Sequence, residues 1–411
     1  MNFSEPLSQY EEILKDAIRT SMKESGAKLA KTFQTLLIEI LTLYMILPRK
    51  INFTQMARYG KHGEQTYRQN FNRKKKVCID WLLLNLSLAR RVLEMDGLLA
   101  IAIDPCYISK AGKKTHHIGR FWSGCAGAVK HGLEIMGIGL LDVANSKCMM
   151  LRAHQTIGNS ALKMRNKTLV EYYISVMKRY SKKLLSITDI VVADAFFSTS
   201  TFEKGMSELG FYIVSRFRDN ACLHYIPNKE KRRGRPRVKG DKIDLANLNL
   251  SCMEELHIDG LDGKAYTLEA YAKALKNRVR LVIWRMPGGK CKLFFSTKLS
   301  MTGEEVLKTY RTRFQIEFCY RDSKQFTGLM DCQTRHKRQL DFAFNASFVS
   351  LNAAKVFMKD NGMDNSMAKV KSLMFNANYT KLIFDMSRCR PNRTLISKIV
   401  KELIGWQPKA A

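Results

Sequence analysis

Two short apolar runs, each followed directly by an aspartate, constrain the fold of this chain more than any other feature. Leu98–Ile103 leads into Asp104, and Ile190–Ala193 leads into Asp194. Apolar runs of about four to eight residues predict buried strands. An acid at the end of such a strand can leave the core and face a ligand. Strand-end aspartates also form turns, so either acid alone is ambiguous.

The segments around these runs predict a mixed α/β fold. Three further strands and a helix are expected, at Gly132–Leu141, Lys147–His154, Phe211–Ser215 and, for the helix, Ser160–Tyr180. With a second helix after Asp194 the order is β-β-β-α-β-α-β, which indicates a mixed sheet covered by helices. Asp142 also ends a strand and resembles Asp104 locally. Asp189 precedes its strand and is expected at the opposite end.

A third acid lies in the stretch from Tyr310 to Lys324, which contains no proline or glycine and follows a helix-start signal at Thr302–Glu305. The stretch predicts one helix. Its turn of about 100° per residue would align four polar side chains in a stripe about 60° wide. The four are Tyr310, Arg313, Glu317 and Lys324, with Arg321 beside them.

Two apolar shoulders are expected beside this polar stripe, one from Phe314 and Phe318 and the other from Ile316 and Tyr320. Such a helix would be packed and would still turn one polar row toward an anionic ligand. An ordinary alternative is a surface helix, because Arg313–Glu317 and Glu317–Arg321 are both i,i+4 pairs.

The charge of the chain points to a polyanionic partner. Lys plus Arg number 69 and Asp plus Glu number 37, which gives a net charge of +32. Nucleic acid fits this excess better than a membrane, since no run approaches the ~18 apolar residues of a membrane span. The N-terminus shows no signal-peptide pattern.

The ten cysteines occur singly, which favours free thiols in a reducing cytosol. A zinc site is conceivable, but its spacing matches no standard ligand pattern. Its members would be Cys106, His116, His117 and Cys125.

Residues 52–71 predict a helix-turn-helix. A short helix capped by Thr54 is followed by a glycine-marked turn and a second short helix, Glu64–Phe71. The second helix would present Arg68 and Gln69 to phosphates and base edges. The alternative is a helical hairpin with a basic, solvated end.

The segment between the last strand and Glu317 predicts a β-rich insertion. Val279–Trp284 and Lys292–Ser296 form a predicted hairpin. The basic loop 229–240 contains Arg235 and Arg237, and its Arg-Gly-Arg-Pro core is similar to the AT-hook, whose arginines enter narrow minor grooves. A solvated flexible loop is the alternative. The C-terminal part predicts helices at Leu340–Met358 and Leu395–Trp406.

Asp104, Asp194 and Glu317, with the Tyr-x2-Arg-x3-Glu-x6-Lys spacing around Glu317, resemble the DDE-class transposases of bacterial insertion sequences that carry the Y-R-E-K signature. The resemblance spans about residues 98–330. It implies a ribonuclease-H-like core, which is a mixed five-stranded sheet with helices. In this core the first acid follows the first strand, the second acid follows the fourth strand, and the third acid lies on a later helix. Asp142, at the end of the second strand, does not match.

The resemblance also implies the chemistry. The three acids would hold two Mg2+ ions, with Mn2+ as a substitute, for in-line attack at phosphorus. Element ends would be cut and the freed 3′-hydroxyl would attack target DNA. Tyr310, Arg313 and Lys324 would hold terminal phosphates. Relatives that make hairpin ends hold a flipped base on an inserted tryptophan; here Trp284 is displaced by one strand.

The partners implied are double-stranded DNA, as terminal inverted repeats and target, and a second copy of the chain in the DNA complex, without a membrane and in the bacterial cytoplasm. Two other functions are carried forward. One is a sequence-specific DNA-binding protein with a vestigial acidic cluster, and the other is a ribonuclease-H-like nuclease without strand transfer.

The expected domain order follows from these segments. It comprises a helical DNA-binding domain at 1–95, the first part of the core at 96–218, a β-rich insertion at 219–300, the completed core at 301–360 and a helical region at 361–411.

Overall fold

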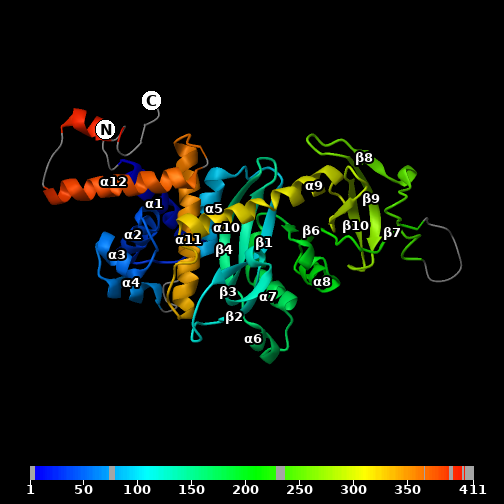
Figure 1. Cartoon of the computed structure of the whole chain (residues 1–411), viewed down its shortest axis with the longest axis horizontal. Coiled ribbons are helices and arrows are strands. Elements are labelled where there is room, and N and C mark those ends of the chain that lie inside the picture. The colour runs from blue at the N-terminus through cyan, green and yellow to red at the C-terminus, as the bar shows by residue number, and fades with distance from the viewer. Residues whose placement is uncertain are drawn as a thin grey trace.

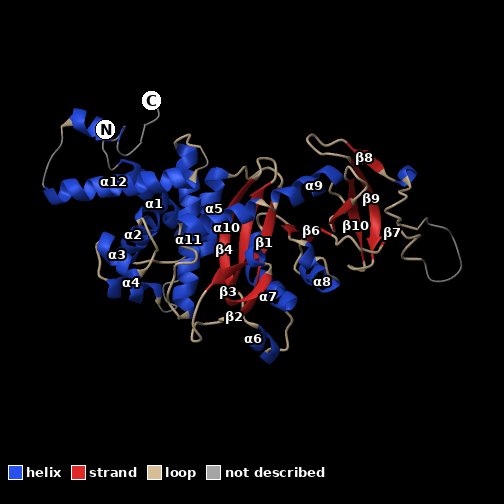
Figure 2. Cartoon of the chain, viewed as in Figure 1, coloured by secondary structure: helices blue, strands red, loops and turns tan. Residues whose placement is uncertain are grey.

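The structure is a computed structural model that describes residues 5–73, 79–227, 237–364, 366–387, 392–399 and 402. Three regions follow one another along its long axis (Figure 1). Helices gather at one end, a sheet with helices occupies the middle, and a strand-rich region forms the other end (Figure 2).

The helical end is built from the N-terminal helices α1 to α5. Their bounds are Glu5–Ser25, Lys31–Ile46, Phe53–Tyr59, Glu64–Phe71 and Trp81–Val92. The two short helices predicted between residues 52 and 71 are present, but Asn52, not Thr54, caps α3 by accepting from the Gln55 amide. Helix α5 is buried along nearly its whole length, because it packs against α1, α11 and β4. It is therefore a helix of the core.

The central sheet contains the five predicted core strands. They are β1 (Leu99–Ser109), β3 (Ala128–Asp142), β4 (Lys147–Gln155), β5 (Ile190–Val192) and β6 (Tyr212–Arg216). Strand β3 pairs antiparallel with both β1 and β4, whereas β5 pairs parallel with β1 and with β6. The order across the sheet is β4-β3-β1-β5-β6. The alternating strands and helices of the sequence thus form the expected mixed sheet.

Two strands of this sheet are longer than predicted. β1 continues through Asp104 to Ser109, so Asp104 lies within a strand and not at its end. β3 begins at Ala128, and its first residues pair with an additional strand, β2 (Gly119–Ser123). The reason is tertiary, since the antiparallel partner β3 continues beside β1 after the parallel partner β5 has ended.

The helix predicted at Ser160–Tyr180 is divided in two. α6 (Asn159–Met164) and α7 (Leu169–Leu185) are separated by a turn in which Asn166 has a positive φ of 50°. Thr168 begins α7 with a capping box, because its hydroxyl accepts from the Glu171 amide while the Glu171 carboxylate accepts from the Thr168 amide. The following helix is α8 (Ser200–Glu208), which is capped by Thr199.

The strand-rich end contains β7 to β11 and extends the same sheet. Their bounds are Leu223–Tyr225, Glu254–Leu256, Lys264–Ala272, Asn277–Arg285 and Cys291–Ser296. The predicted hairpin is confirmed, since β10 and β11 pair antiparallel. β11 also pairs with β6, which joins this insertion to the core strands.

The stretch that was predicted as one helix forms two. α9 (Gly303–Thr312) and α10 (Gln315–Phe326) meet at a tight turn where the Arg313 and Phe314 amides donate to carbonyls three residues earlier. α9 packs against β6, β9, β10 and β11, whereas α10 packs against β1, β4 and α11. The two helices thus pack against different strands, but Arg313 and Phe314 between them keep αR dihedrals, so that α10 and α9 run nearly end to end (Figure 1).

Only one of the two expected apolar shoulders of this stretch is buried. Ile316 and Tyr320 lie in the core, whereas Phe314 and Phe318 are 49% and 37% exposed. The exposed pair packs edge to face on itself, with ring centroids 5.1 Å apart. α10 therefore covers the sheet with a single face.

The remaining helices cover the helical end. α11 (Lys337–Asp360) is buried from Gln339 to Met358 except for Asp341 and Lys355, and it stands between the N-terminal helices and the sheet. α12 (Met367–Ser387) and α13 (Arg393–Lys398) follow, and the predicted end of the last helix lies outside the described residues. In the part of the chain that the structure describes, no helix is long and apolar enough to cross a membrane. The eight cysteines in that part are all free thiols.

Candidate active site

The strand register brings Asp104 and Asp194 to neighbouring positions. Ala102 on β1 pairs with Val192 on β5 in a parallel register, and each acid lies two residues beyond its member of this pair. Because side chains alternate across a strand, each acid leaves the sheet on the face of the pair. Neighbouring strands are about 4.8 Å apart. The two acids, 90 residues apart in sequence, therefore lie side by side at the end of β5.

Asp194 ends its strand as predicted and begins a short turn. Its carboxylate accepts a hydrogen bond of 3.0 Å from the Phe196 amide, and its carbonyl accepts one of 2.9 Å from the Ser215 hydroxyl. The ring of Phe196 beside it is 41% exposed. One carboxylate oxygen is therefore held by the backbone.

Helix α10 is anchored to the same sheet by a close approach. The Tyr320 hydroxyl donates a 2.5 Å hydrogen bond to the carbonyl of Asp104. A Cβ on Gly137, which pairs with Asp104 across β1 and β3, would lie 2.0 Å from that hydroxyl oxygen. Only glycine leaves room for the tyrosine there. This contact sets α10 directly over β1 and brings Glu317, in the first turn of the helix, toward Asp104.

Arg313 lies between two of the three acids. Its guanidinium donates a 2.9 Å hydrogen bond to Glu317, and it is 3.9 Å from the carboxylate of Asp104. The Arg313 side chain is 13% exposed, and its Nε has no acceptor among the described residues. The i,i+4 pair of Arg313 and Glu317 that would suit a surface helix is therefore present. Its arginine, however, is buried and also faces Asp104 on the sheet.

The surroundings of Asp104 raise its pKa to about 7. Burial is the largest cause, and the carboxylates of Asp194, Glu317 and Glu134 add to it, while Arg313 opposes it. Asp194 and Glu317 are therefore close enough to Asp104 to repel its charge. The site has more negative charge than Arg313 compensates.

The donor set suits a hard divalent cation in its chemistry. Carboxylate oxygens are the preferred ligands of Mg2+, and such an ion would relieve the repulsion that raises the pKa of Asp104. In these positions, however, no three Asp, Glu, His or Cys side chains of the described residues converge on one ion position. The same holds for the zinc site considered at Cys106, His116, His117 and Cys125: Cys106 is buried in β1 and Cys125 is exposed on a turn.

Tyr310 and Lys324 lie on different helices and have different neighbours. Tyr310, on α9, packs against Phe294 with ring centroids 5.1 Å apart, and its ring lies 5.7 Å from the guanidinium of Arg313. Burial raises the pKa of the Tyr310 hydroxyl. Lys324, near the end of α10, is close to the thiol of Cys106 on β1. Burial raises the pKa of this thiol to about 11, although the ammonium of Lys324 acts to lower it.

The two other acids at strand ends have structural partners. Asp142 accepts hydrogen bonds from the amide of Glu94 and from the amide and side chain of Asn145. Burial opposes these bonds, but together they lower the pKa of Asp142. Asp189 forms an ion pair of 2.8 Å with Lys298 at the other end of β5. Neither residue joins the cluster around Asp104.

The predicted DNA-contacting residues outside the cluster are dispersed. Arg68 is exposed on α4 but is paired with Glu64, and its guanidinium lies 5.1 Å from the ring of Phe53; Gln69 beside it is exposed. Arg321 forms a 2.9 Å ion pair with Asp322. Arg237 is exposed, and Arg235 lies outside the described residues.

Sequence reasoning missed one acid beside the site. Glu134, in the middle of β3, is 6% exposed and accepts a 2.5 Å hydrogen bond from the Tyr173 hydroxyl. Burial raises its pKa. The signal available was weak: Glu134 is the single acid inside the apolar run from Leu133 to Leu141. A buried acid there requires a partner from another element, which only the fold supplies.

The sequence matches the family described as "DDE superfamily endonuclease" over residues 27–274, which is more than half of the chain. The protein is a member of the DDE superfamily endonucleases. The match includes Asp104 and Asp194 and ends before Glu317. No curated protein matches the chain. Membership of this superfamily indicates an enzyme of the nuclease or transposase type that acts on DNA, and such nucleases typically use divalent metal ions.

Proposed function

We propose that this DDE superfamily member is the transposase of a bacterial insertion sequence, with the Y-R-E-K signature at Tyr310, Arg313, Glu317 and Lys324. It would cut DNA at the element ends and join the 3′-hydroxyl ends to target DNA. The observation that supports this best is geometric: the register of β1 and β5 sets Asp104 beside Asp194, and Arg313 lies 2.9 Å from Glu317 and 3.9 Å from Asp104.

The proposed catalytic core is ribonuclease-H-like. The strand order β4-β3-β1-β5-β6, with β3 antiparallel to its neighbours and β5 parallel to its own, supports this assignment. The domain division at residues 95, 218, 300 and 360 belongs to the same proposal, with α9 and α10 completing the core after the β-rich insertion.

Asp104, Asp194 and Glu317 would hold two Mg2+ ions. When bound, the ions supply charge neutralisation at the phosphorus under attack and an activated water or 3′-hydroxyl. The acids of the chain orient these oxygens, and no covalent enzyme intermediate is needed. Because burial and the neighbouring carboxylates raise the pKa of Asp104, cations held by this carboxylate would compete with a proton there.

Arg313 is the residue with the clearest role toward DNA. Its partners are now carboxylates, and its Nε donor has no acceptor among the described residues. A terminal phosphate would accept from this guanidinium by a charge-assisted bond. Tyr310 beside it, and Lys324 further along α10, would contact the same strand. Arg321, Arg68, Gln69, Arg235 and Arg237 would contact DNA outside the reacting phosphate, in a homodimer that bridges two element ends.

The test is cleavage and strand transfer on DNA that carries the inverted repeats flanking the gene. The variants Asp104→Asn, Asp194→Asn and Glu317→Gln should each bind this DNA and fail to cut it in Mg2+ or Mn2+. Asp142→Asn serves as the matched control and should cut. Cleavage that survives a change in any of the three acids would refute the site.

The same assay separates the other functions. Binding by the native protein without any cleavage would identify a DNA-binding protein with a vestigial acidic cluster. Cleavage of the repeats with no joining of a pre-cut 3′ end to target DNA would identify a nuclease without strand transfer.

A further inference from the structure

A basic groove lies apart from the acidic cluster, where the N-terminal helices, β4, α7 and α11 meet. Its volume is about 940 Å³, and residues from all of these elements line it. None of Asp104, Asp194, Arg313 or Glu317 is among them. The groove is therefore a separate feature of the molecule.

The groove is strongly positive. Eight Lys or Arg side chains line it, against two Asp side chains, Asp80 and Asp341. Both acids are already paired, Asp341 with Arg152 at 2.6 Å and Asp80 with Lys183. Arg165, Arg179, Lys337 and Arg338 form no ion pair with any acid that the structure describes. An uncompensated group of cations in a concave site attracts an anionic ligand.

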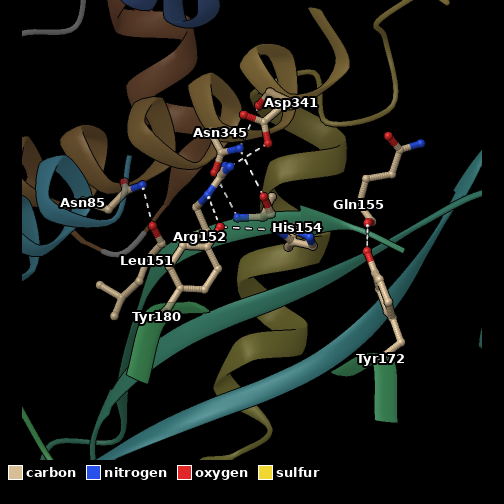
Figure 3. A network of polar contacts seen from close by, with 10 residues as sticks. Asn85, Leu151, Arg152, His154, Gln155, Tyr172, Tyr180, Asp341 and Asn345 are labelled. Carbon is tan, nitrogen blue, oxygen red and sulfur yellow. Dashed lines mark hydrogen bonds and ion pairs between the residues drawn. The ribbon is translucent and has the colours of Figure 1, made fainter. Parts of the chain in front are cut away.

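A fixed network forms one wall of the groove (Figure 3). Arg152 donates 3.1 Å to the Tyr180 hydroxyl and 2.6 Å to Asp341, and its side chain is 12% exposed. Its second terminal nitrogen, Nη1, has no acceptor among the described residues. The guanidinium is thus held in place by two partners and keeps one donor unused.

Two histidines, His117 and His154, line the groove among these cations. Burial, followed by the charges of Arg152, Arg179 and Lys337, lowers the pKa of His154 to about 3. Burial and the charges of His116, Lys337 and Arg165 lower that of His117 to about 4. The arginines and lysine come from β4, α6–α7 and α11, yet they act on the same pair of rings.

The ligand that fits these features carries several phosphates in a row. Arginine and lysine bind phosphate by charge and by multiple N–H donors. The volume suits a few nucleotides and is too small to enclose a duplex. We propose that this groove binds the phosphate backbone of a single strand of DNA, at a distance from the acids that would cut it. The proposal adds a second DNA contact to the function proposed above and does not depend on its chemistry.

The test compares two double variants that remove the same charge. Arg179→Ala with Lys337→Ala removes two exposed cations of the groove. Lys178→Ala with Lys182→Ala removes two exposed cations from α7 that do not line it. The full chain is titrated with a fluorescent 12-nucleotide DNA strand in EDTA, so that no cleavage occurs, over a range of salt concentrations.

The groove variant should lose about tenfold in affinity at 0.1 M salt. The slope of log K against log salt should fall by about 1.4, because each lost contact with a single strand removes about 0.7. The control variant should stay within about twofold of the native chain. Equal losses in the two variants, or no loss in the groove variant, would overturn the proposal, as would a loss seen with a duplex but not with the single strand.

A further arm separates this inference from the proposed function. Asp104→Asn should bind the strand as the native chain does, and the groove variant should bind Mn2+ as the native chain does. If the three acids prove not to be catalytic, the result for strand binding by Asp104→Asn still stands. If the groove proves not to bind DNA, the result for Mn2+ binding by the groove variant still stands.

Discussion

Asp104→Asn should stabilise the metal-free protein by an amount that grows as pH rises from about 4 to about 7. The physical basis is the pKa of Asp104, which burial and the neighbouring carboxylates raise from 3.8 to about 7. The folded state holds the proton more tightly than the unfolded state does. The stability that this bound proton contributes is therefore fully present below pH 4. It is lost as pH rises toward 7, where the carboxylate must ionise inside the protein.

The magnitude follows from the size of the shift. One pKa unit corresponds to 1.36 kcal/mol, so the change from 3.8 to about 7 costs the folded state up to ~4 kcal/mol at pH 8. Asn keeps the shape of the protonated acid and avoids this cost. With an unfolding entropy of about 2.1 cal/mol/K per residue, this would raise the unfolding midpoint of a 411-residue chain by about 5 °C.

Thermal unfolding in EDTA at pH 4.5, 6 and 8 would measure the difference between the Asn variant and the native protein. The gain in midpoint should be small at pH 4.5, should reach most of its full size at pH 6 and should be greatest at pH 8. Asp142→Asn provides a control of opposite sign, because hydrogen bonds outweigh burial and lower the pKa of Asp142, so that its charge stabilises the fold at pH 8. A gain for Asp104→Asn that is equal at all three pH values, or a loss at pH 8, would refute the electrostatic reasoning.

Three further results are expected. Gly137→Ala should push Tyr320 and α10 away from β1, with a cost of about 1–3 kcal/mol and loss of DNA cleavage at temperatures where circular dichroism still shows a folded chain; normal cleavage would contradict the role of this contact. Arg313→Gln should raise the affinity for Mn2+ on the order of tenfold, as the cation between two carboxylates is removed, which isothermal titration calorimetry would detect; unchanged affinity would argue against metal binding there. Asp189→Asn should change stability by less than about 1 kcal/mol, because its ion pair with Lys298 is partly exposed, and should leave cleavage intact, measured by denaturation and by the DNA assay; loss of cleavage would mean that the wrong acid was chosen at this strand.

The elements with strong local patterns could be predicted from the sequence. β4, β5, β6 and the β10–β11 hairpin lie where apolar runs and turn residues indicated, and α11 matches the helix predicted at Leu340–Met358 closely. These signals are local, since period and turn chemistry are properties of neighbouring residues. The positions at which a predicted helix is interrupted were less predictable. Nothing between 302 and 324 forbids a continuous helix, and Arg313 and Phe314 do keep αR dihedrals. Only the hydrogen-bond pattern changes there, at the point where α9 and α10 begin to pack on different strands.

The candidate site divides in the same way. The chemical type of Asp104, Asp194 and Glu317 and the spacing around Glu317 were available from the sequence, and they determined which acids to consider. Only the tertiary structure decided which acids meet. The register between β1 and β5 sets Asp104 beside Asp194, and Tyr320 over Gly137 brings the third acid across. Asp142 is instead held by the amide of the distant Glu94 and by the nearby Asn145. Glu134 and the basic groove were invisible before folding, because their charges come from segments that are adjacent only in space.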